Sequence, residues 1–194
     1  MDKEMDALQA LQQRVSVARL TGPVPDQQTQ DNLFKAALRA PDHCMLRPWR
    51  FLTISGDARE ALGELFVIAQ QVDSPDMTAV QQQRMLAKPM RAPLIVVVIA
   101  VLTEHAKVPE LEQLLSAGAA AQNMLVAAHA MGLGAIWRTG GMSYHPAVRQ
   151  GLGLDEHERL LGFLYIGQIE GKTRLIPSLP IETFVTAWAS PSLT

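Results

Sequence analysis

The strongest constraint on the fold of this 194-residue chain is a run of eight apolar residues, LIVVVIAV, at positions 94–101, directly after Pro93. The run is dense in β-branched residues, which favour strands over helices. It lacks the alternation of polar and apolar residues that marks a strand with one face in water. We therefore expect a central strand that is covered on both faces.

The other elements are predicted from periodicity and from the residues that begin and end helices and strands. Helices are expected at 5–13, 26–39, 56–72, 111–131 and 145–150, a polar helical segment at 73–88, and further strands at 49–55, 134–139 and 160–167. Strict βαβ alternation is absent, so the pattern predicts an α+β fold with a mainly antiparallel or mixed sheet flanked by helices. No repeat or linker divides the chain, and a single domain over residues 1–194 is expected.

Charge and composition exclude several classes of function. The formal net charge is −2, so no basic face is implied that would bind a nucleic-acid backbone. The one cysteine, Cys44, excludes an internal disulfide and fits a reducing cytoplasm. The N-terminal residues lack the pattern of a signal peptide, and the longest apolar run, 92–102, is too short to span a bilayer as a helix. We expect a cytoplasmic protein with no membrane or nucleic-acid partner.

The familiar catalytic motifs are missing from the sequence. It has no P-loop, HExxH or GxSxG motif, and its five histidines show no metal-ligand spacing. Gly132-Leu133-Gly134 lacks the third glycine of a dinucleotide-binding loop and precedes a strand instead of following one. We therefore expect neither a metal site nor a Rossmann-type nucleotide site.

Cationic and hydroxyl side chains lie beside the predicted helix ends and turns. An anionic ligand such as a phosphate requires donors of this kind. The alternative is that each arginine is a surface charge whose stem covers apolar neighbours. The candidates are Arg14 with Ser16, Arg39, His43, Arg47, and Arg138 with Thr139.

An ordered set of segments around these residues resembles the flavin-dependent nitroreductase family, and it is most similar to the short, YdjA-like branch. The segments are Arg14-Val15-Ser16, RAPDH (39–43), RPWRF (47–51), Ser116–Gly118, GLGAIWRTG (132–140) and GFLYIGQ (162–168). The resemblance covers the chain from about Met5 to Trp188. It implies a nitroreductase-like fold, an intertwined homodimer, FMN at the subunit interface and NAD(P)H as co-substrate.

The resemblance also implies roles for individual residues. Arg14 and Ser16 would hold the FMN phosphate. Val15 stands where the family has a second arginine, so either the affinity for FMN is lower or Arg138 or Arg47 compensates. Arg39 and His43 would reach FMN across the dimer interface, and Arg39 or Arg138 would place positive charge near flavin N1 and O2. Flavin contacts are also implied at Trp137, Arg138 and Thr139. A C-terminal arm, about 178–194, would reach the partner subunit.

The function implied is that of an FMN-dependent NAD(P)H oxidoreductase that reduces nitroaromatic or quinone-like small molecules. No side chain is expected to be catalytic, because the flavin carries the hydride. Two alternatives remain: a flavin-binding protein for storage or sensing that is not a reductase, and a dimeric structural module whose arginines serve only the subunit interface. Structural alternatives also remain. Arg14 can stabilise the C-terminal end of a helix dipole, His43 can cap a turn, and Arg138 can form an ion pair.

Overall fold

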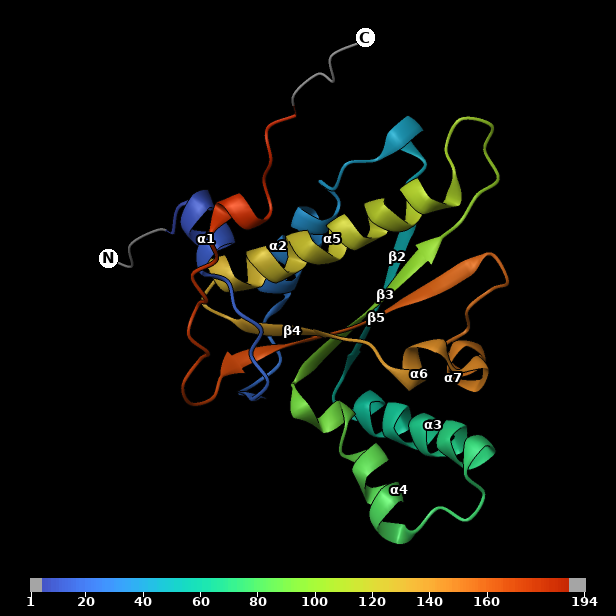
Figure 1. Cartoon of the computed structure of the whole chain (residues 1–194). Helices are drawn as coiled ribbons and strands as arrows, with labels where there is room; N and C mark the ends of the chain where they lie inside the picture. The colour runs from blue at the N-terminus through green and yellow to red at the C-terminus, as the bar shows by residue number, and fades with distance from the viewer. Residues whose placement is uncertain (1–4, 189–194) are drawn as a thin grey trace.

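The computed structural model describes residues 5–188, and one antiparallel sheet forms its centre (Figure 1). β3 (Leu94–Val101) lies between β2 (Trp49–Ser55) and β5 (Glu158–Ile169). Residues 163–166 of β5 pair with both β3 and β4 (Gly134–Arg138), so β5 separates these two strands. Seven of the eight residues of β3 are buried, and the prediction of a central, doubly covered strand is confirmed.

Helices cover both faces of this sheet (Figure 1). On one face lie α1 (Ala7–Gln13), α2 (Gln27–Ala37) and α5 (Glu110–Ala130); on the other lie α3 (Ala58–Asp73), α4 (Ala79–Leu86), α6 (Gly141–Tyr144) and α7 (Pro146–Gly151). Alternate residues of β3 enter two separate cores, with Val96 and Val98 packed toward α5 and Ile95 and Val97 toward α3. The predicted α+β fold is confirmed, and all pairings between the named strands are antiparallel.

The shortest elements were not predicted. They are β1 (Leu20–Thr21), α6 and the 3-10 turns η1 (His43–Met45), η2 (Pro89–Arg91) and η3 (Ile181–Thr183). Elements of two to four residues are too short to show a period, which explains the omission. Within the polar segment 73–88, α3 ends at its first residue and α4 covers eight residues, beginning at a capping box formed by Thr78 and Gln81.

Gly132 ends α5 and turns the chain into β4. Its φ is +75°, a conformation that glycine adopts without strain, and the N–H of Leu133 donates to the carbonyl of Ala128 at 2.8 Å. Gly132-Leu133-Gly134 is therefore a helix cap that leads into a strand, as its sequence context indicated.

A bulge in β5 fixes the far end of β4. The register between β3 and β5 shifts beside Gly162, whose φ is +134°. A Cβ at this position would lie 2.6 Å from Nε1 of Trp137 and 2.7 Å from the carbonyl oxygen of Arg138. Nε1 of Trp137 donates to the carbonyl of Leu161 at 3.0 Å. Trp137 is thus a structural anchor that holds the end of β4 against β5.

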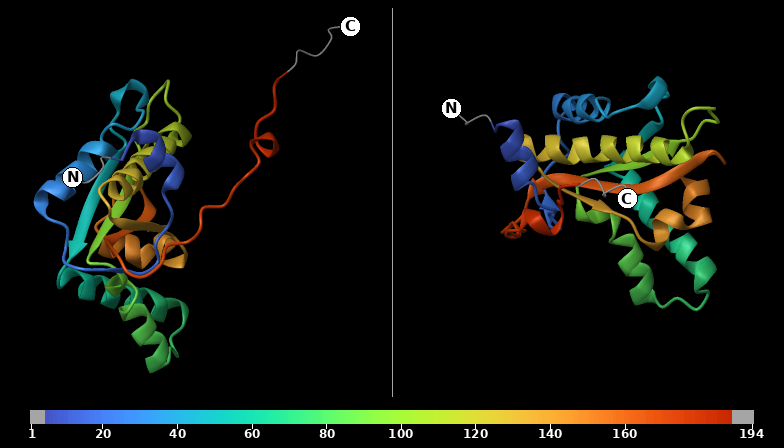
Figure 2. Two further views of the ribbon diagram at one scale, coloured as in Figure 1. Left: turned by 90° about the vertical axis from the view of Figure 1, so that its left-hand side faces the viewer. Right: turned by 45° about the horizontal axis from the view of Figure 1, so that its top comes forward.

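The segment after β5 extends away from the rest of the molecule (Figure 2). Its residues from 170 to 188 are exposed, and Leu175 and Trp188 keep 94% and 84% of their surface accessible. Of the C-terminal arm expected at 178–194, residues 189–194 lie outside the described part of the chain. No helix within residues 5–188 is long and apolar enough to cross a membrane.

Candidate functional site

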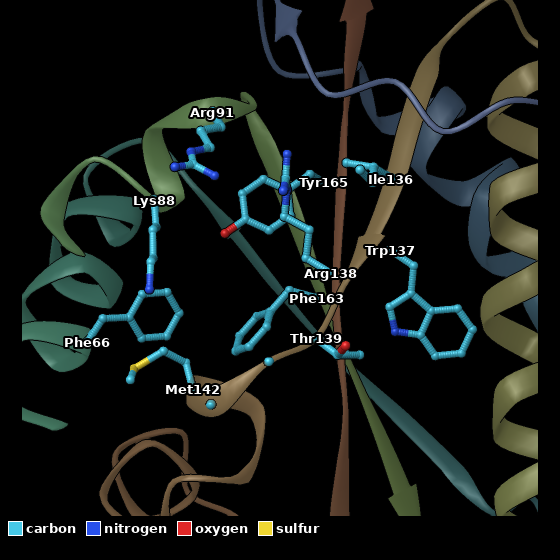
Figure 3. A pocket seen from close by; sticks show the side chains of 12 residues that line it. Phe66, Lys88, Arg91, Ile136, Trp137, Arg138, Thr139, Met142, Phe163 and Tyr165 are labelled. Atoms are coloured by element: carbon cyan, nitrogen blue, oxygen red, sulfur yellow. The ribbon is translucent and has the colours of Figure 1, made fainter. Parts of the chain in front are cut away.

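A pocket of about 380 Å³ opens where the end of β4 meets α3, η2 and α6 (Figure 3). β4 and β5 supply part of its wall through alternate side chains, while Lys88, just before η2, and Arg91, at its end, line the opposite side. The lining residues are Phe66, Lys88, Arg91, Ile136, Trp137, Arg138, Thr139, Gly140, Gly141, Met142, Phe163 and Tyr165.

The charged residues of this pocket are all cations: Lys88, Arg91 and Arg138. Burial lowers the pKa of Lys88, and the charge of Arg91 lowers it further. The same two causes, in the same order, lower the pKa of Arg138. The positive charges therefore lie close enough to repel one another, and an anion bound between them would relieve that repulsion.

Arg138 is held over an aromatic ring and still lacks a polar partner. Its guanidinium carbon lies 5.4 Å from the ring centroid of Tyr165, and its Nε is buried without a hydrogen bond. No described carboxylate forms an ion pair with Arg138, so a structural ion pair does not explain this residue. A buried donor without a partner is costly, which points to a ligand that accepts from it.

Tyr165 is a buried phenol at the floor of the pocket (Figure 3). Burial raises its pKa, although the charges of Arg138 and Arg91 act in the opposite direction. The hydroxyl is therefore protonated near neutral pH and can donate a hydrogen bond.

Arg14, Val15 and Ser16 lie beside the first residues of β4. Arg14 ends α1, and Ser16 forms a parallel bridge with Ala135. Ala135 and Arg138 are three residues apart on β4, which is roughly 10 Å along an extended strand. The structure therefore aligns the Arg14–Ser16 segment and the pocket along one strand, at a separation that an elongated ligand could span.

Arg14 faces the C-terminal end of α5. Its Nη1 is buried without a hydrogen bond, and so is Nε2 of His129 in the last turn of that helix. Burial lowers the pKa of His129, and the charge of Arg14 lowers it further. A buried guanidinium nitrogen and a buried imidazole nitrogen, both without a hydrogen-bond partner, indicate a second point where an anion would be held.

Arg39 and His43 lie elsewhere in the chain. Arg39 borders a separate hollow with Arg47 and Met45, and Nδ1 of His43 lies 2.6 Å from Oε2 of Glu112. Glu112 is in the first turn of α5 and His129 in the last, so about 26 Å of helix separates them at 1.5 Å per residue. One chain therefore does not bring His43 and Arg14 around the same small ligand.

The loop that carries His43 is strained and tightly held. Cys44, Met45 and Arg47 have φ of +59°, +54° and +54°, which non-glycine residues rarely adopt. The carboxylate of Asp42 accepts hydrogen bonds from the backbone N–H of Leu46 and Arg47 and from Nη1 of Arg47 at 2.6 Å. Arg47 is thus engaged by Asp42.

Lys88, Arg91 and Tyr165 were missed by the sequence reasoning. Their only local signals are the KPMR segment before the central strand and the alternation in GFLYIG, which places Phe163 and Tyr165 on one face. Neither signal states which distant residues lie opposite.

Comparisons with known proteins agree with this architecture. A model described as Nitroreductase family matches residues 11–168. An Escherichia coli K12 protein provisionally named NAD(P)H nitroreductase YdjA is 39% identical over 183 residues, covering 94% of this chain and 99% of the relative. A Haemophilus influenzae protein with a similar provisional name is 32% identical over 93% of this chain and 100% of its own length.

Solved structures share the fold. A nitroreductase-like family protein from Bacillus cereus superposes with a TM-score of 0.80 at 22% identity, covering 97% of this chain and 98% of the other. A mutant of NfnB, a nitroreductase described as FMN- and NADPH-dependent, from Sphigopyxis sp. strain HMH, gives a TM-score of 0.74 at 17% identity and covers 95% and 99%. The ordered segments, the fold and the match over most of the length agree: the chain belongs to the nitroreductase family.

Proposed function

We propose that the protein is an FMN-dependent NAD(P)H oxidoreductase that reduces nitroaromatic or quinone-like acceptors. The observation that carries the proposal is the alignment, along β4, of unpartnered Arg14 at one end and a cationic pocket at the other. The hydride chemistry would come from bound FMN, which accepts a hydride, carries negative charge when reduced and passes electrons to the acceptor. A cytoplasmic location, with Cys44 unpaired, and a single domain over residues 1–194 are parts of the same proposal.

The phosphate would be held at the beginning of β4. Arg14 offers a buried, unpartnered Nη1, and the exposed Ser16 follows two residues later. Val15 is half-buried against the core on the α3 side of the sheet, so it contributes backbone and not charge. A charge-assisted hydrogen bond of the kind Arg14 would make contributes about 1.5–3 kcal/mol.

The flavin ring would lie at the end of β4, beside Arg138 and Thr139. Arg138 and Lys88 would stabilise the negative charge near N1 and O2, because preorganised cations in a half-buried pocket act strongly on charge that develops there. Tyr165 would keep its proton and donate to an acceptor atom. Trp137 would act indirectly, by fixing the strand end through its bond to Leu161.

Arg39 and His43 would belong to the site of the partner subunit. The length of α5 separates His43 from Arg14 within one chain, and a homodimer resolves the separation if the loop of each chain covers the site of the other. The exposed apolar side chains of the arm, Phe184, Val185 and Trp188, fit the same proposal, since a partner surface would bury them.

An anaerobic titration tests the proposal directly. Protein loaded with FMN should be yellow and should bleach on addition of NADH or NADPH, then recover its colour with a nitroaromatic or quinone. Arg14→Glu should lose FMN, whereas Arg19→Glu, an exposed control in the same segment, should retain it. Failure of the wild-type protein to bind FMN would refute the proposal, and binding with very slow reduction would favour storage or sensing.

A mixed dimer tests whether the site is shared. Arg14→Glu and a double variant of Arg39 and His43 should each bind little FMN as homodimers. When the two chains are combined, one site carries every substitution and the other carries none, so about half of the wild-type FMN content should return. If isolated mixed dimers recovered no FMN binding, Arg14, Arg39 and His43 would all belong to the site of one chain.

A further inference from the structure

The pocket at the end of β4 holds more positive charge than a reduced flavin can neutralise. Three cations, Lys88, Arg91 and Arg138, line it, and its lining contains no carboxylate. None of them forms an ion pair with a carboxylate in the described part of the chain. A single negative charge on reduced FMN would leave two of the three positive charges without a counterion.

Arg91 is the cation that is free to serve a second ligand. It is exposed on η2, while Lys88 and Arg138 are half-buried. Its charge lowers the pKa of both neighbours, so it lies within electrostatic reach of the same bound molecule. η2 is short. Its first residue, Pro89, is buried, and β3 follows it closely, so the backbone of Arg91 is held at the rim of the pocket.

The remaining walls suit an aromatic ring. Phe66 and Phe163 pack edge to face with ring centroids 5.5 Å apart, and Met142 lies beside them (Figure 3). Both rings are almost fully buried and Met142 is half-buried, so together they form an apolar wall next to unpaired cations. Such a wall is complementary to a ring that carries an acidic substituent.

We propose that this pocket selects aromatic acceptors bearing an acidic group, such as a nitrobenzoate or a carboxylated quinone, with the acid at Arg91 and the ring toward Phe66 and Phe163. The inference rests on the proposed function, because FMN must supply the electrons. For a nitro acceptor the balance is one NAD(P)H and one proton consumed, one nitroso product and one water released. The carboxylate takes no part in that exchange and serves only in recognition.

A matched pair of acceptors tests this preference. 4-Nitrobenzoate and 4-nitrobenzamide share a ring and a nitro group and differ in charge, and kcat/KM is measured for both with the FMN-loaded dimer. Their intrinsic reactivities differ, so the decisive quantity is the benzoate-to-benzamide ratio in a variant divided by that ratio in the wild type. Arg91→Gln should lower the ratio about fivefold, which is the upper range for an exposed charge pair.

Arg84→Gln is the control, since Arg84 is an exposed cation on α4 outside the lining and its loss should leave the ratio unchanged. Added salt should also reduce the wild-type preference, because screening weakens exposed charge pairs. An unchanged ratio in Arg91→Gln would overturn the inference while leaving FMN-dependent turnover intact. Failure of NADH and NADPH to reduce the bound FMN would instead remove the proposed function.

The dinucleotide offers a rival use for the same charge. Rapid anaerobic reduction by NADH, which carries a pyrophosphate, is compared with reduction by dihydronicotinamide riboside, which carries none. If Arg91→Gln slows only NADH and leaves the acceptor ratio unchanged, Arg91 binds the dinucleotide and the acidic-acceptor proposal is wrong. A lowered acceptor ratio supports the proposal whichever donor is used.

Discussion

Gly162→Ala is the substitution expected to damage the site most while altering none of its side chains. The new methyl group would lie 2.6 Å from Nε1 of Trp137 and 2.7 Å from the carbonyl oxygen of Arg138. The second contact is with backbone, which cannot move without shifting the end of β4. The φ of +134° adds strain, because residues with a Cβ rarely adopt it.

The cost follows from these two effects. Backbone strain of this kind costs about 1–3 kcal/mol. An added methyl in a closely packed position typically costs about 1–3 kcal/mol more. We therefore expect a destabilisation of about 4 kcal/mol, which for a chain of this size lowers Tm by about 8–16 °C. FMN retention should fall as well, since Arg138 sits on the displaced strand end.

Thermal unfolding followed by circular dichroism measures the change, with Gly153→Ala as the control. Gly153 also has a positive φ, +68°, but no atom lies within 4 Å of the position its Cβ would take. That variant carries strain alone, about 1–2 kcal/mol. Equal decreases in Tm for the two variants would show that Trp137 and Arg138 do not approach Gly162 closely enough to exclude a methyl group.

Three further predictions concern charge and assembly. Glu158→Gln should cost about 3 kcal/mol, because it leaves the charge of Arg50 unpaired in a half-buried position. The hydrogen bond from Arg50 lowers the pKa of Glu158, so the ion pair stabilises the folded state above about pH 4.5 and this stabilisation is lost as the pH falls further. In urea unfolding, the wild type should lose this stability on acidification and Glu158→Gln should not. The pKa of His129 is lower in the folded state than in the unfolded state, so His129 takes up a proton on unfolding below pH 6.5 and the free energy of unfolding should fall as the pH drops. His129→Gln should abolish this dependence in urea titrations at pH 5–7. Deleting residues 178–194 should reduce both dimer content in light scattering and bound FMN, and a truncated chain that stays dimeric and yellow would contradict the arm's role.

Local pattern sufficed for the parts of the fold that local physics determines. LIVVVIAV has no polar face, so its burial between two strands and two helical layers followed from composition. Gly132 lacks a Cβ and follows a long apolar helix, so it was predictable as a cap. The same reasoning placed Arg14 and Arg138 beside element ends.

Convergence across the chain was not predictable in this way. Lys88 and Arg91 precede β3, Arg138 ends β4 and Tyr165 lies within β5, so their meeting depends on strand order and register. His43 lies against Glu112, 69 residues away. A sequence window contains no information about such distances, and an exposed-looking KPMR segment reads as an ordinary surface turn.

Val15 leaves Arg14 without a second arginine beside it in the predicted phosphate site. The family has a second arginine at this position, so the expectation was either a lower affinity for FMN or compensation by Arg138 or Arg47. Arg47 is bound to Asp42, and Arg138 lies at the opposite end of β4, roughly 10 Å along the strand. Neither stands beside Arg14. His129 is the basic side chain that lies beside Arg14. Because burial and the charge of Arg14 lower its pKa, its imidazole is uncharged as long as no anion is bound. A phosphate placed between them would reverse the sign of the local field and favour protonation of His129, so this side chain is the one positioned to supply the missing positive charge.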